Sequence, residues 1–429
     1  MPKAGPVEQK ADKEAVSFLA SLGPGLITGA ADDDPSGIAT YSQAGAQFGF
    51  SMLWTTVLCL PMMIAIQSIA ARIGCVTGKG LAANLKTVGP PWLAGALVSL
   101  LLAANIINIA ADLAAMAEAA RLVLPMLRLH VYVVIFGVVS LLLQVFLSYH
   151  RYVKFLKWLT LALLAYVGVV FAVKVPWEEA LKGALIPHWD GSKEQVTMIV
   201  AILGTTISPY LFFWQSSQEV EEIQEHEHLH DLRHERKDKA DLQIKRIRVD
   251  TIVGMAFSQL IAFFVILTAA VTLHGQGATE IGSAADAAAA LKPIAGDLAF
   301  ALFSAGIIGT GFLAVPVLAG SAAYAVAEMR GWEFGLSHKL MQAKGFYAII
   351  AVAILGGVAL AFSPLDPIKA LYWAAVINGV AAVPIMVATM IVATRKSRMG
   401  RYVANRFQRW FGWAATVFMA LAAIAMFVL

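Results

Sequence analysis

Three successive carboxylates and a helix-breaking sequence interrupt the first long apolar segment of the chain, residues 22–50, as the run Asp32-Asp33-Asp34-Pro35-Ser36-Gly37. Pro35 cannot donate an amide hydrogen and Gly37 permits unusual dihedral angles, so we expect the helix to break beside Asp34. A carboxylate next to freed backbone carbonyls offers oxygen donors to a cation. Because successive helical residues point about 100° apart, the three carboxylates cannot all face one site. We expect Asp34 to be the ligand, and Asp32 and Asp33 to line an aqueous access path.

A second apolar segment, residues 196–214, is interrupted near its middle by Ser208-Pro209. Thr205, Thr206 and Ser208 place hydroxyl groups around this break. Such hydroxyls also bond back to carbonyls of their own helix, so for each of them both roles stay open. The second break therefore adds neutral oxygen donors to the carboxylate of the first.

A polar stripe follows one face of the otherwise apolar segment 97–116, where Asn105, Asn108 and Asp112 are spaced i, i+3 and i+7. At about 100° per residue they lie within about 60° of one another, so we expect them to face the interior of a helix bundle. Asp112 would supply a second carboxylate there. Asn378 is a lone amide in another apolar run, for which an interhelical hydrogen bond and ligation are both open.

These side chains and the freed carbonyls make an all-oxygen donor set, which suits hard cations such as Mg²⁺, Ca²⁺ or Mn²⁺. No Cys, Met or His lies at either break, so the sequence does not favour a site for soft metals. We expect no prosthetic group and no catalytic residue. A histidine tract stands apart from the breaks, in the longest polar stretch of the chain, and we interpret it as a solvated helical extension, with adventitious metal capture as the alternative: His226, His228, His230 and His234.

The elements that must position these donors are membrane-spanning helices. Hydrophobic residues make up 59% of the chain and charged residues 14%, with mean hydropathy +0.72, whereas a soluble chain carries roughly 25% charged residues. Spans need about 20 mostly apolar residues. Eleven candidates are centred near residues 34, 62, 103, 139, 164, 208, 262, 308, 352, 380 and 419.

Charge sets the expected orientation of these spans. With the N-terminus in the cytoplasm, 25 of the 32 Lys and Arg residues fall on the cytoplasmic side, as the positive-inside rule requires. Eleven spans then place Leu429 outside. The formal net charge of +4 follows from this loop bias, so we expect no nucleic-acid partner. Cys59 and Cys75 fall near the second span, and we expect two free thiols.

The spans divide into two halves. Residues 17–174 hold spans one to five and residues 196–393 hold spans six to ten, so an odd number of spans inverts the second half. The broken spans are the first of each half, which is the arrangement of an inverted-repeat secondary transporter with its site at the midplane. Residues 1–16 form a cytoplasmic tail, and residues 394–429 hold a cytoplasmic link and span eleven.

Several motifs resemble the Nramp family of divalent-metal transporters. The first helix carries the resemblance most specifically, in Gly23-Pro24-Gly25, Asp34-Pro35-Ser36-Gly37-Ile38-Ala39-Thr40 and Gln43-Ala44-Gly45-Ala46-Gln47-Phe48-Gly49. The loop after helix two and the start of the helix-three motif are also similar, in Arg72-Ile73-Gly74, Val76-Thr77-Gly78-Lys79-Gly80-Leu81-Ala82 and Asp112-Leu113-Ala114. The resemblance spans the ten-helix core and implies an all-α integral membrane protein with a LeuT-type 5+5 inverted repeat.

Departures from the family pattern bear on the cargo. The family's first motif usually ends in Asn, where this chain has Gly37, and its sixth-helix motif Met-Pro-His is Ser208-Pro209-Tyr210 here. In the family the Met sulfur favours transition metals, and the His and an Arg on helix nine are tied to proton movement. Residues 346–362 contain no Arg, and Ala115 replaces a helix-three carboxylate. The combination is most similar to the Nramp-related magnesium-transporter branch, which implies transport without proton coupling.

We therefore expect a plasma-membrane (inner-membrane) importer of Mg²⁺, with Mn²⁺ as a further cargo, that works by alternating access. The expected metal-site residues are Ala31 (through its carbonyl), Asp34, Gly37, Asp112, Thr205 and Ser208. The alternatives are a proton-coupled Mn²⁺/Fe²⁺ transporter and a sodium-coupled organic solute symporter. An intramembrane enzyme that uses the three aspartates to bind Mg²⁺ would need a second acidic motif and basic residues at the same depth, and neither is found. The oligomeric state is left open by the sequence.

Overall fold

The structure is a computed structural model of the full chain, and it describes residues 24–146, 163–225, 232–233, 235, 237–364 and 366–429. All regular structure in this part of the chain is helical. Eight of its helical stretches are long and apolar enough to cross a membrane, and α17 is a shorter apolar helix. The count of eleven spans stays a prediction, because much of the span expected near residue 164 lies outside the described residues.

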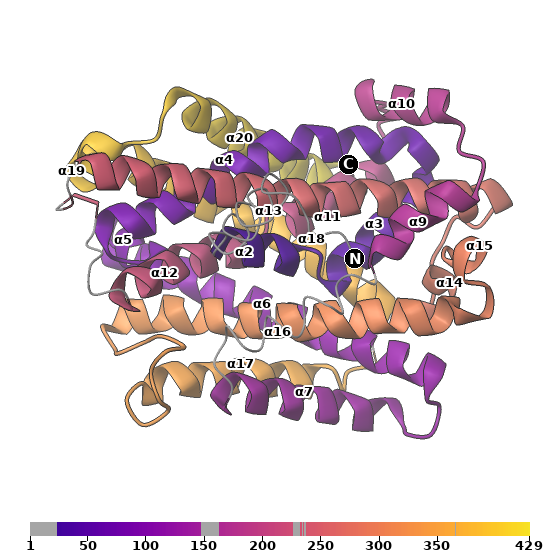
Figure 1. Ribbon diagram of the computed structural model, residues 1–429, viewed down its shortest axis with the longest axis horizontal. Helices are drawn as coiled ribbons and strands as arrows, with labels where there is room; N and C mark the ends of the chain where they lie inside the picture. The colour runs from indigo at the N-terminus through magenta and orange to yellow at the C-terminus, as the bar shows by residue number, and fades with distance from the viewer. Residues whose placement is uncertain (1–23, 147–162, 226–231, 234, 236, 365) are drawn as a thin grey trace, which may run out of the picture.

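The long helices run roughly along one direction of the molecule (Figure 1). Their bounds are α4 (Leu53–Thr77), α6 (Pro91–Val123), α7 (Leu129–Phe146), α13 (Lys237–Thr272), α16 (Ala299–Arg330), α17 (Lys344–Leu360), α18 (Pro367–Thr394) and α20 (Arg406–Val428). The shorter helix α9 (Leu164–Ala172) packs against α13. Shorter elements connect them at the ends of the bundle, namely η1 (Gly49–Met52), α5 (Leu81–Leu85), α10 (Trp177–Leu185), η3 (His274–Gln276), α14 (Ala284–Ala289), α15 (Lys292–Ala295), η4 (Gly296–Leu298), α19 (Lys396–Met399) and η5 (Gly400–Tyr402).

Both predicted helix breaks are confirmed. The first separates α2 (Pro24–Asp32) from α3 (Pro35–Phe48), and the second separates α11 (Lys193–Thr206) from α12 (Pro209–Glu225). In each case a proline opens the second half-helix, where its missing N–H leaves no hydrogen bond unmade. All four half-helices lie in the middle of the bundle, between the long helices (Figure 1).

Small residues let the half-helices approach their neighbours closely. A Cβ added to Gly29 of α2 would lie 2.3 Å from the carbonyl oxygen of Gly254 on α13, and one added to Gly204 of α11 would lie 2.0 Å from the carbonyl oxygen of Ala375 on α18. Backbone contacts of this kind are typical of helix packing in membranes. They fix α2 against α13 and α11 against α18, and thereby fix both breaks.

Polar contacts anchor the ends of the half-helices. The carboxylate of Asp250 accepts a hydrogen bond from the backbone N–H of Gly25 at the start of α2, at 2.7 Å. Near the end of α12, Glu219 pairs with Arg246 of α13 at 2.9 Å, and Glu221 accepts from the N–H of Ser337 at 2.6 Å. The half-helices are thus tied to α13 and to the loop after α16.

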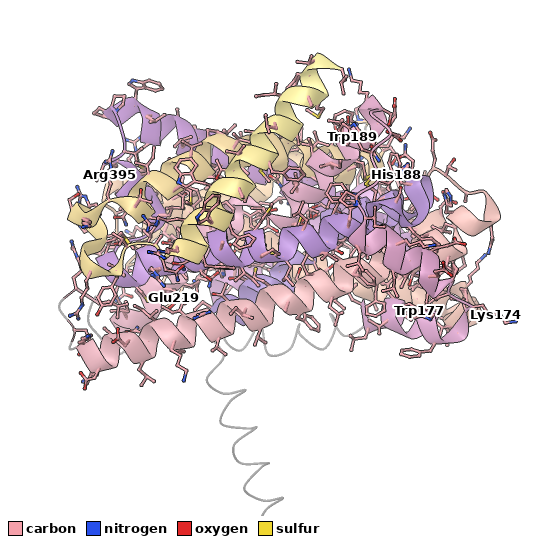
Figure 2. All side chains as sticks on the ribbon, turned by 90° about the horizontal axis from the view of Figure 1, so that it is seen from above. Lys174, Trp177, His188, Trp189, Glu219 and Arg395 are labelled. Atoms are coloured by element: carbon pink, nitrogen blue, oxygen red, sulfur yellow. The ribbon has the colours of Figure 1, made fainter. Side chains whose placement is uncertain are left out.

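The positive-inside pattern assigns Lys174 and Arg395 to opposite sides of the membrane, and they lie at opposite ends of the bundle. Lys174, Trp177, His188 and Trp189 lie at one end, and Glu219 and Arg395 lie at the other (Figure 2). This separation is the one that the predicted orientation requires, and which end faces the cytoplasm stays a prediction. Cys59 and Cys75 are free and buried, as expected.

Candidate metal-binding site

Asp34 lies between α2 and α3 and caps α3 with its own carboxylate. Its Oδ1 accepts hydrogen bonds from the Ser36 hydroxyl at 2.6 Å and from the Gly37 N–H at 2.7 Å. Its Oδ2 accepts longer bonds from Asn108 Nδ2 at 3.3 Å and from Tyr210 Oη at 3.2 Å. The residue is 1% exposed. One carboxylate therefore links the first break to α6 and to the second broken helix.

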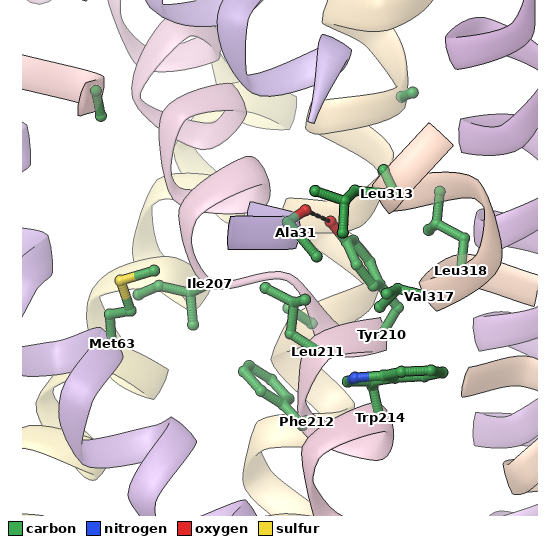
Figure 3. Packing of buried hydrophobic residues seen from close by; sticks show 14 of the residues in the cluster. Ala31, Met63, Ile207, Tyr210, Leu211, Phe212, Trp214, Leu313, Val317 and Leu318 are labelled. Atoms are coloured by element: carbon green, nitrogen blue, oxygen red, sulfur yellow. Dashed lines mark hydrogen bonds between the residues drawn. The ribbon is translucent and has the colours of Figure 1, made fainter. Parts of the chain in front are cut away.

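Tyr210 connects the two breaks a second time. Its hydroxyl lies 3.3 Å from the carbonyl oxygen of Ala31, which α2 frees next to the break (Figure 3). Its ring is fully buried beside Leu313 and Val317 of α16. Tyr210 was not among the site residues predicted from the sequence. Its position directly after Pro209, at the second helix break, could have indicated it.

Gly37 and Thr205 face one another across the two half-helices. A Cβ added to Gly37 would lie 3.1 Å from Thr205 Oγ1. This hydroxyl is buried and has no hydrogen-bond partner among the described residues. The absence of a side chain at position 37 therefore leaves a neutral oxygen donor facing the first break.

Ser208 is directed differently from Thr205. Its hydroxyl lies 2.6 Å from the carbonyl oxygen of Gly204 and 2.8 Å from that of Thr205, so it donates back into α11. This is the back-bonded role that the sequence left open. Ser208 lies at the break, but only the lone pairs of its oxygen remain for a ligand.

Asp112 is fully buried on α6, and neither of its carboxylate oxygens has a hydrogen-bond partner in the described part of the chain. It follows Asn108 by one helical turn and lies close enough to Asp34 for the two charges to interact. Two carboxylates buried together are costly unless something compensates their charge. A divalent cation between them would do so.

The expectation that Asp32 and Asp33 line an aqueous path is wrong in this conformation. They are 0% and 2% exposed. Ser258 of α13 lies between them, with its hydroxyl 2.5 Å from Asp32 Oδ2 and 3.2 Å from Asp33 Oδ1. The physical reason is the close packing of α2 on α13 at Gly29, which brings this face of α2 against protein rather than water.

Asn105 and Asn378, the other two amides that the sequence analysis names, differ in their contacts. Asn105 donates to the carbonyl oxygen of Leu318 at 2.8 Å and lies 2.9 Å from the Ser321 hydroxyl, so it joins α6 to α16. Asn378 on α18 is 1% exposed, and neither atom of its amide has a partner within the described residues. The interhelical bond considered for Asn378 is therefore not found there.

The donors at this position are mainly oxygens of different kinds. Among the described residues, no group of three or more His, Cys, Asp and Glu side chains could hold a metal ion. A cation here would depend on two carboxylates together with carbonyl, hydroxyl and amide oxygens. The four histidines of the tract expected to be solvated all lie outside the described residues.

Comparisons with known proteins agree with this architecture. The family model described as "Natural resistance-associated macrophage protein-like" (Nramp) matches residues 25–429. The divalent metal cation transporter MntH of Klebsiella pneumoniae subsp. pneumoniae is 27% identical over 410 residues, covering 92% of this chain and 91% of the relative. MntH of Mycobacterium tuberculosis is 26% identical over 411 residues, covering 93% and 89%.

Solved structures show the same fold. The crystal structure of the Eremococcus coleocola manganese transporter aligns with a TM-score of 0.75 at 17% identity, covering 99% of this chain and 88% of that one. Mhp1, a nucleobase-cation-symport-1 family transporter, aligns with a TM-score of 0.60 at 12% identity, covering 95% and 91%. The second match extends the likeness to LeuT-fold transporters, as the sequence predicts.

The fold is the one shared by LeuT-fold transporters, and the family match shows a transporter, not an enzyme. Within that class, the chain belongs to the Nramp family.

Proposed function

We propose that this protein is a secondary transporter that carries divalent metal cations across the membrane by alternating access. The observation that carries the proposal is the meeting of both helix breaks at Asp34. The buried carboxylate of Asp112, which has no hydrogen-bond partner among the described residues, is near enough for its charge to interact with that of Asp34. Irregular backbone at membrane depth is tolerated where it is buried in protein or lines a cavity. The two carboxylates, if both are ionised, carry two negative charges, which match the charge of one divalent cation.

Mn²⁺ is the cargo best supported by the comparisons, because the relatives carry the names of divalent-metal and manganese transporters. This supports the manganese alternative better than the magnesium branch. Mg²⁺ is a second candidate because position 208 holds Ser, and Mg²⁺ prefers oxygen ligands and keeps several waters. Mn²⁺ also accepts carboxylate and carbonyl oxygens, so the same site suits both ions.

A sodium-coupled symporter for an organic solute has the same fold but fits the charge of this site less well. The pocket at the first break of such a protein would receive a substrate carboxylate, and the charge of Asp34 would repel it. We propose import across the plasma membrane, since an inward-negative potential contributes about 2.3 kcal/mol per charge per 100 mV.

Proteoliposomes that contain the full-length protein test this function. We expect Mn²⁺ and Mg²⁺ entry, reported by metal-sensitive dyes in the lumen, and no entry in empty liposomes. Absence of uptake of either ion under an inward-negative potential would overturn the proposal.

Coupling is tested in the same vesicles with a trapped pH-sensitive dye. We propose uptake without proton movement, because Tyr210 replaces the His that the family pattern ties to proton movement and residues 346–362 lack its Arg. Ala115 also replaces the usual helix-three carboxylate. We therefore expect a constant lumenal pH during metal entry, with ionophore controls. A metal-dependent fall in pH would show that proton coupling exists.

A further inference from the structure

The hydroxyl of Tyr210 occupies a position that the family resemblance does not explain. It lies 3.2 Å from Asp34 Oδ2 and 3.3 Å from the carbonyl oxygen of Ala31, two oxygens that we expect to bind the metal ion (Figure 3). We infer that this hydroxyl is itself a direct oxygen ligand of the transported cation. The inference rests on the proposed function and adds a specific ligand to it.

The distance of the Tyr210 hydroxyl from each of the other two oxygens is close to the distance between neighbouring ligands on one ion. In an octahedral site with metal–oxygen distances of about 2.0–2.1 Å, adjacent ligands stand about 2.8–3.0 Å apart, and for Ca²⁺ distances of about 2.3–2.6 Å they stand about 3.3–3.7 Å apart. The distance of 3.2 Å falls between these ranges, and that of 3.3 Å is at the lower limit of the second. An ion that coordinates Asp34 and Ala31 therefore lies within reach of Tyr210 after shifts of a few tenths of an ångström.

The hydroxyl can change from donor to ligand without moving the ring. It has a single hydrogen for two acceptors, and its oxygen carries two lone pairs. Rotation about the carbon–oxygen bond turns the hydrogen away and presents a lone pair to the ion. The ring itself is held in place, because it is 0% exposed and packed beside Leu313 and Val317 (Figure 3).

Asn108 supports the same geometry from α6. Its Nδ2 lies 3.3 Å from Asp34 Oδ2, while its Oδ1 is buried without a partner among the described residues. Half a turn of the amide exchanges the two atoms and presents an oxygen to the site. With Asp34 and Asp112 supplying two charges, the neutral phenol and amide add ligands without adding charge.

A competing role for Tyr210 is purely structural, in which the hydroxyl only holds Asp34 in place. Loss of an outer partner of a metal ligand also lowers the affinity for metal. A fall in affinity therefore shows only that the hydroxyl contributes to binding. The ligand role predicts in addition that the bound metal perturbs the ring of Tyr210 directly.

Titration calorimetry of Mn²⁺ and Mg²⁺ on the purified full-length protein tests whether the Tyr210 hydroxyl contributes to metal binding. For Tyr210→Phe we expect a loss of affinity of about 10–100-fold for both ions, at least as large as the loss of an outer partner of a metal ligand. The matched control is Tyr132→Phe on α7. The Tyr132 hydroxyl donates a part-buried hydrogen bond to the carbonyl oxygen of Leu124 at 2.6 Å. The affinity of this control variant should equal that of the wild type. Equal or tighter binding by Tyr210→Phe would overturn the inference.

Ultraviolet difference spectra provide a second measurement, because a metal ion bound directly to the hydroxyl of Tyr210 should change the absorption band of this tyrosine. Adding Mn²⁺ to the wild type should perturb the tyrosine band, and the perturbation should persist in Tyr132→Phe and vanish in Tyr210→Phe. If Tyr210→Phe does not fold, an unperturbed tyrosine band in the wild type at saturating Mn²⁺ overturns the inference. If the proposed function itself is wrong, the wild type binds neither ion, and this result differs from every outcome that overturns only the role of Tyr210.

Discussion

Each of the two helix breaks contains a proline, but one contributes a charged carboxylate to the site and the other contributes neutral oxygens. At the first break, Asp34 caps α3 with one oxygen and directs the other toward α6 and α12. At the second, the Ser208 hydroxyl returns its hydrogen to carbonyls of α11. The charge therefore comes from the first break, while Thr205 and Tyr210 bring neutral oxygens to it from either side of the second. A proline break marks where a site can lie, and the neighbouring side chains decide what it binds.

The largest expected effect is at the first break. Asp34→Ala removes the charge and all four hydrogen bonds that its carboxylate accepts, so we expect binding of Mn²⁺ and Mg²⁺ to fall by about 100-fold or more and uptake to cease. Asp190→Ala is the control, because Asp190 is an exposed carboxylate that bonds to the Ser192 N–H at the end of the bundle. Near-normal uptake by Asp34→Ala would place the site elsewhere.

The second carboxylate, Asp112, should affect the affinities for Mg²⁺ and Mn²⁺ to different extents. Asp112→Ala should weaken Mg²⁺ binding by about tenfold and Mn²⁺ binding by less, because Mn²⁺ tolerates a wider range of donors. Competition between the two ions in the uptake assay measures the difference. An equal loss for both ions would mean that Asp112 supports the fold rather than the site.

Contact between the two breaks is tested by adding one methyl group. Gly37→Ala places a Cβ 3.1 Å from Thr205 Oγ1, which is a tight contact, so we expect affinity for both metals to fall several-fold with the fold retained. Gly356→Ala on α17 is the control, since its Cβ would meet Ile106 at an ordinary 3.4 Å. Calorimetry on both variants measures the effect, and a Gly37→Ala protein that binds like the control would argue that position 37 does not line the site.

Local chemistry made the breaks and Asp34 predictable. Pro35 and Pro209 act on the backbone beside them, and Asp34 stands where an N-cap belongs. The polar stripe on α6 was predictable from helical periodicity, although Asn105 joins α16 while Asn108 reaches Asp34.

Tertiary packing decided what the sequence did not reveal. Asp32 and Asp33 are buried because α13, more than 200 residues further along the chain, presents Ser258 to them. The direction of the Tyr210 hydroxyl depends on how α12 leans on α2, which no periodicity encodes. Ser208 had two open roles, and only the geometry distinguishes the back-bonded one.

The smallest expected effect is at the second break and completes the comparison. Ser208→Ala removes a hydroxyl whose hydrogen is already used by Gly204 and Thr205, so metal affinity should change little, while the free energy of unfolding falls by about 0.5–1.5 kcal/mol. Thr205→Val removes a hydroxyl of similar size that faces Gly37 and has no partner among the described residues, so it should lower affinity more. Calorimetry and thermal unfolding of the two variants give both quantities. If Ser208→Ala costs more affinity than Thr205→Val, the second break supplies its ligand from Ser208, and the contrast between the breaks fails.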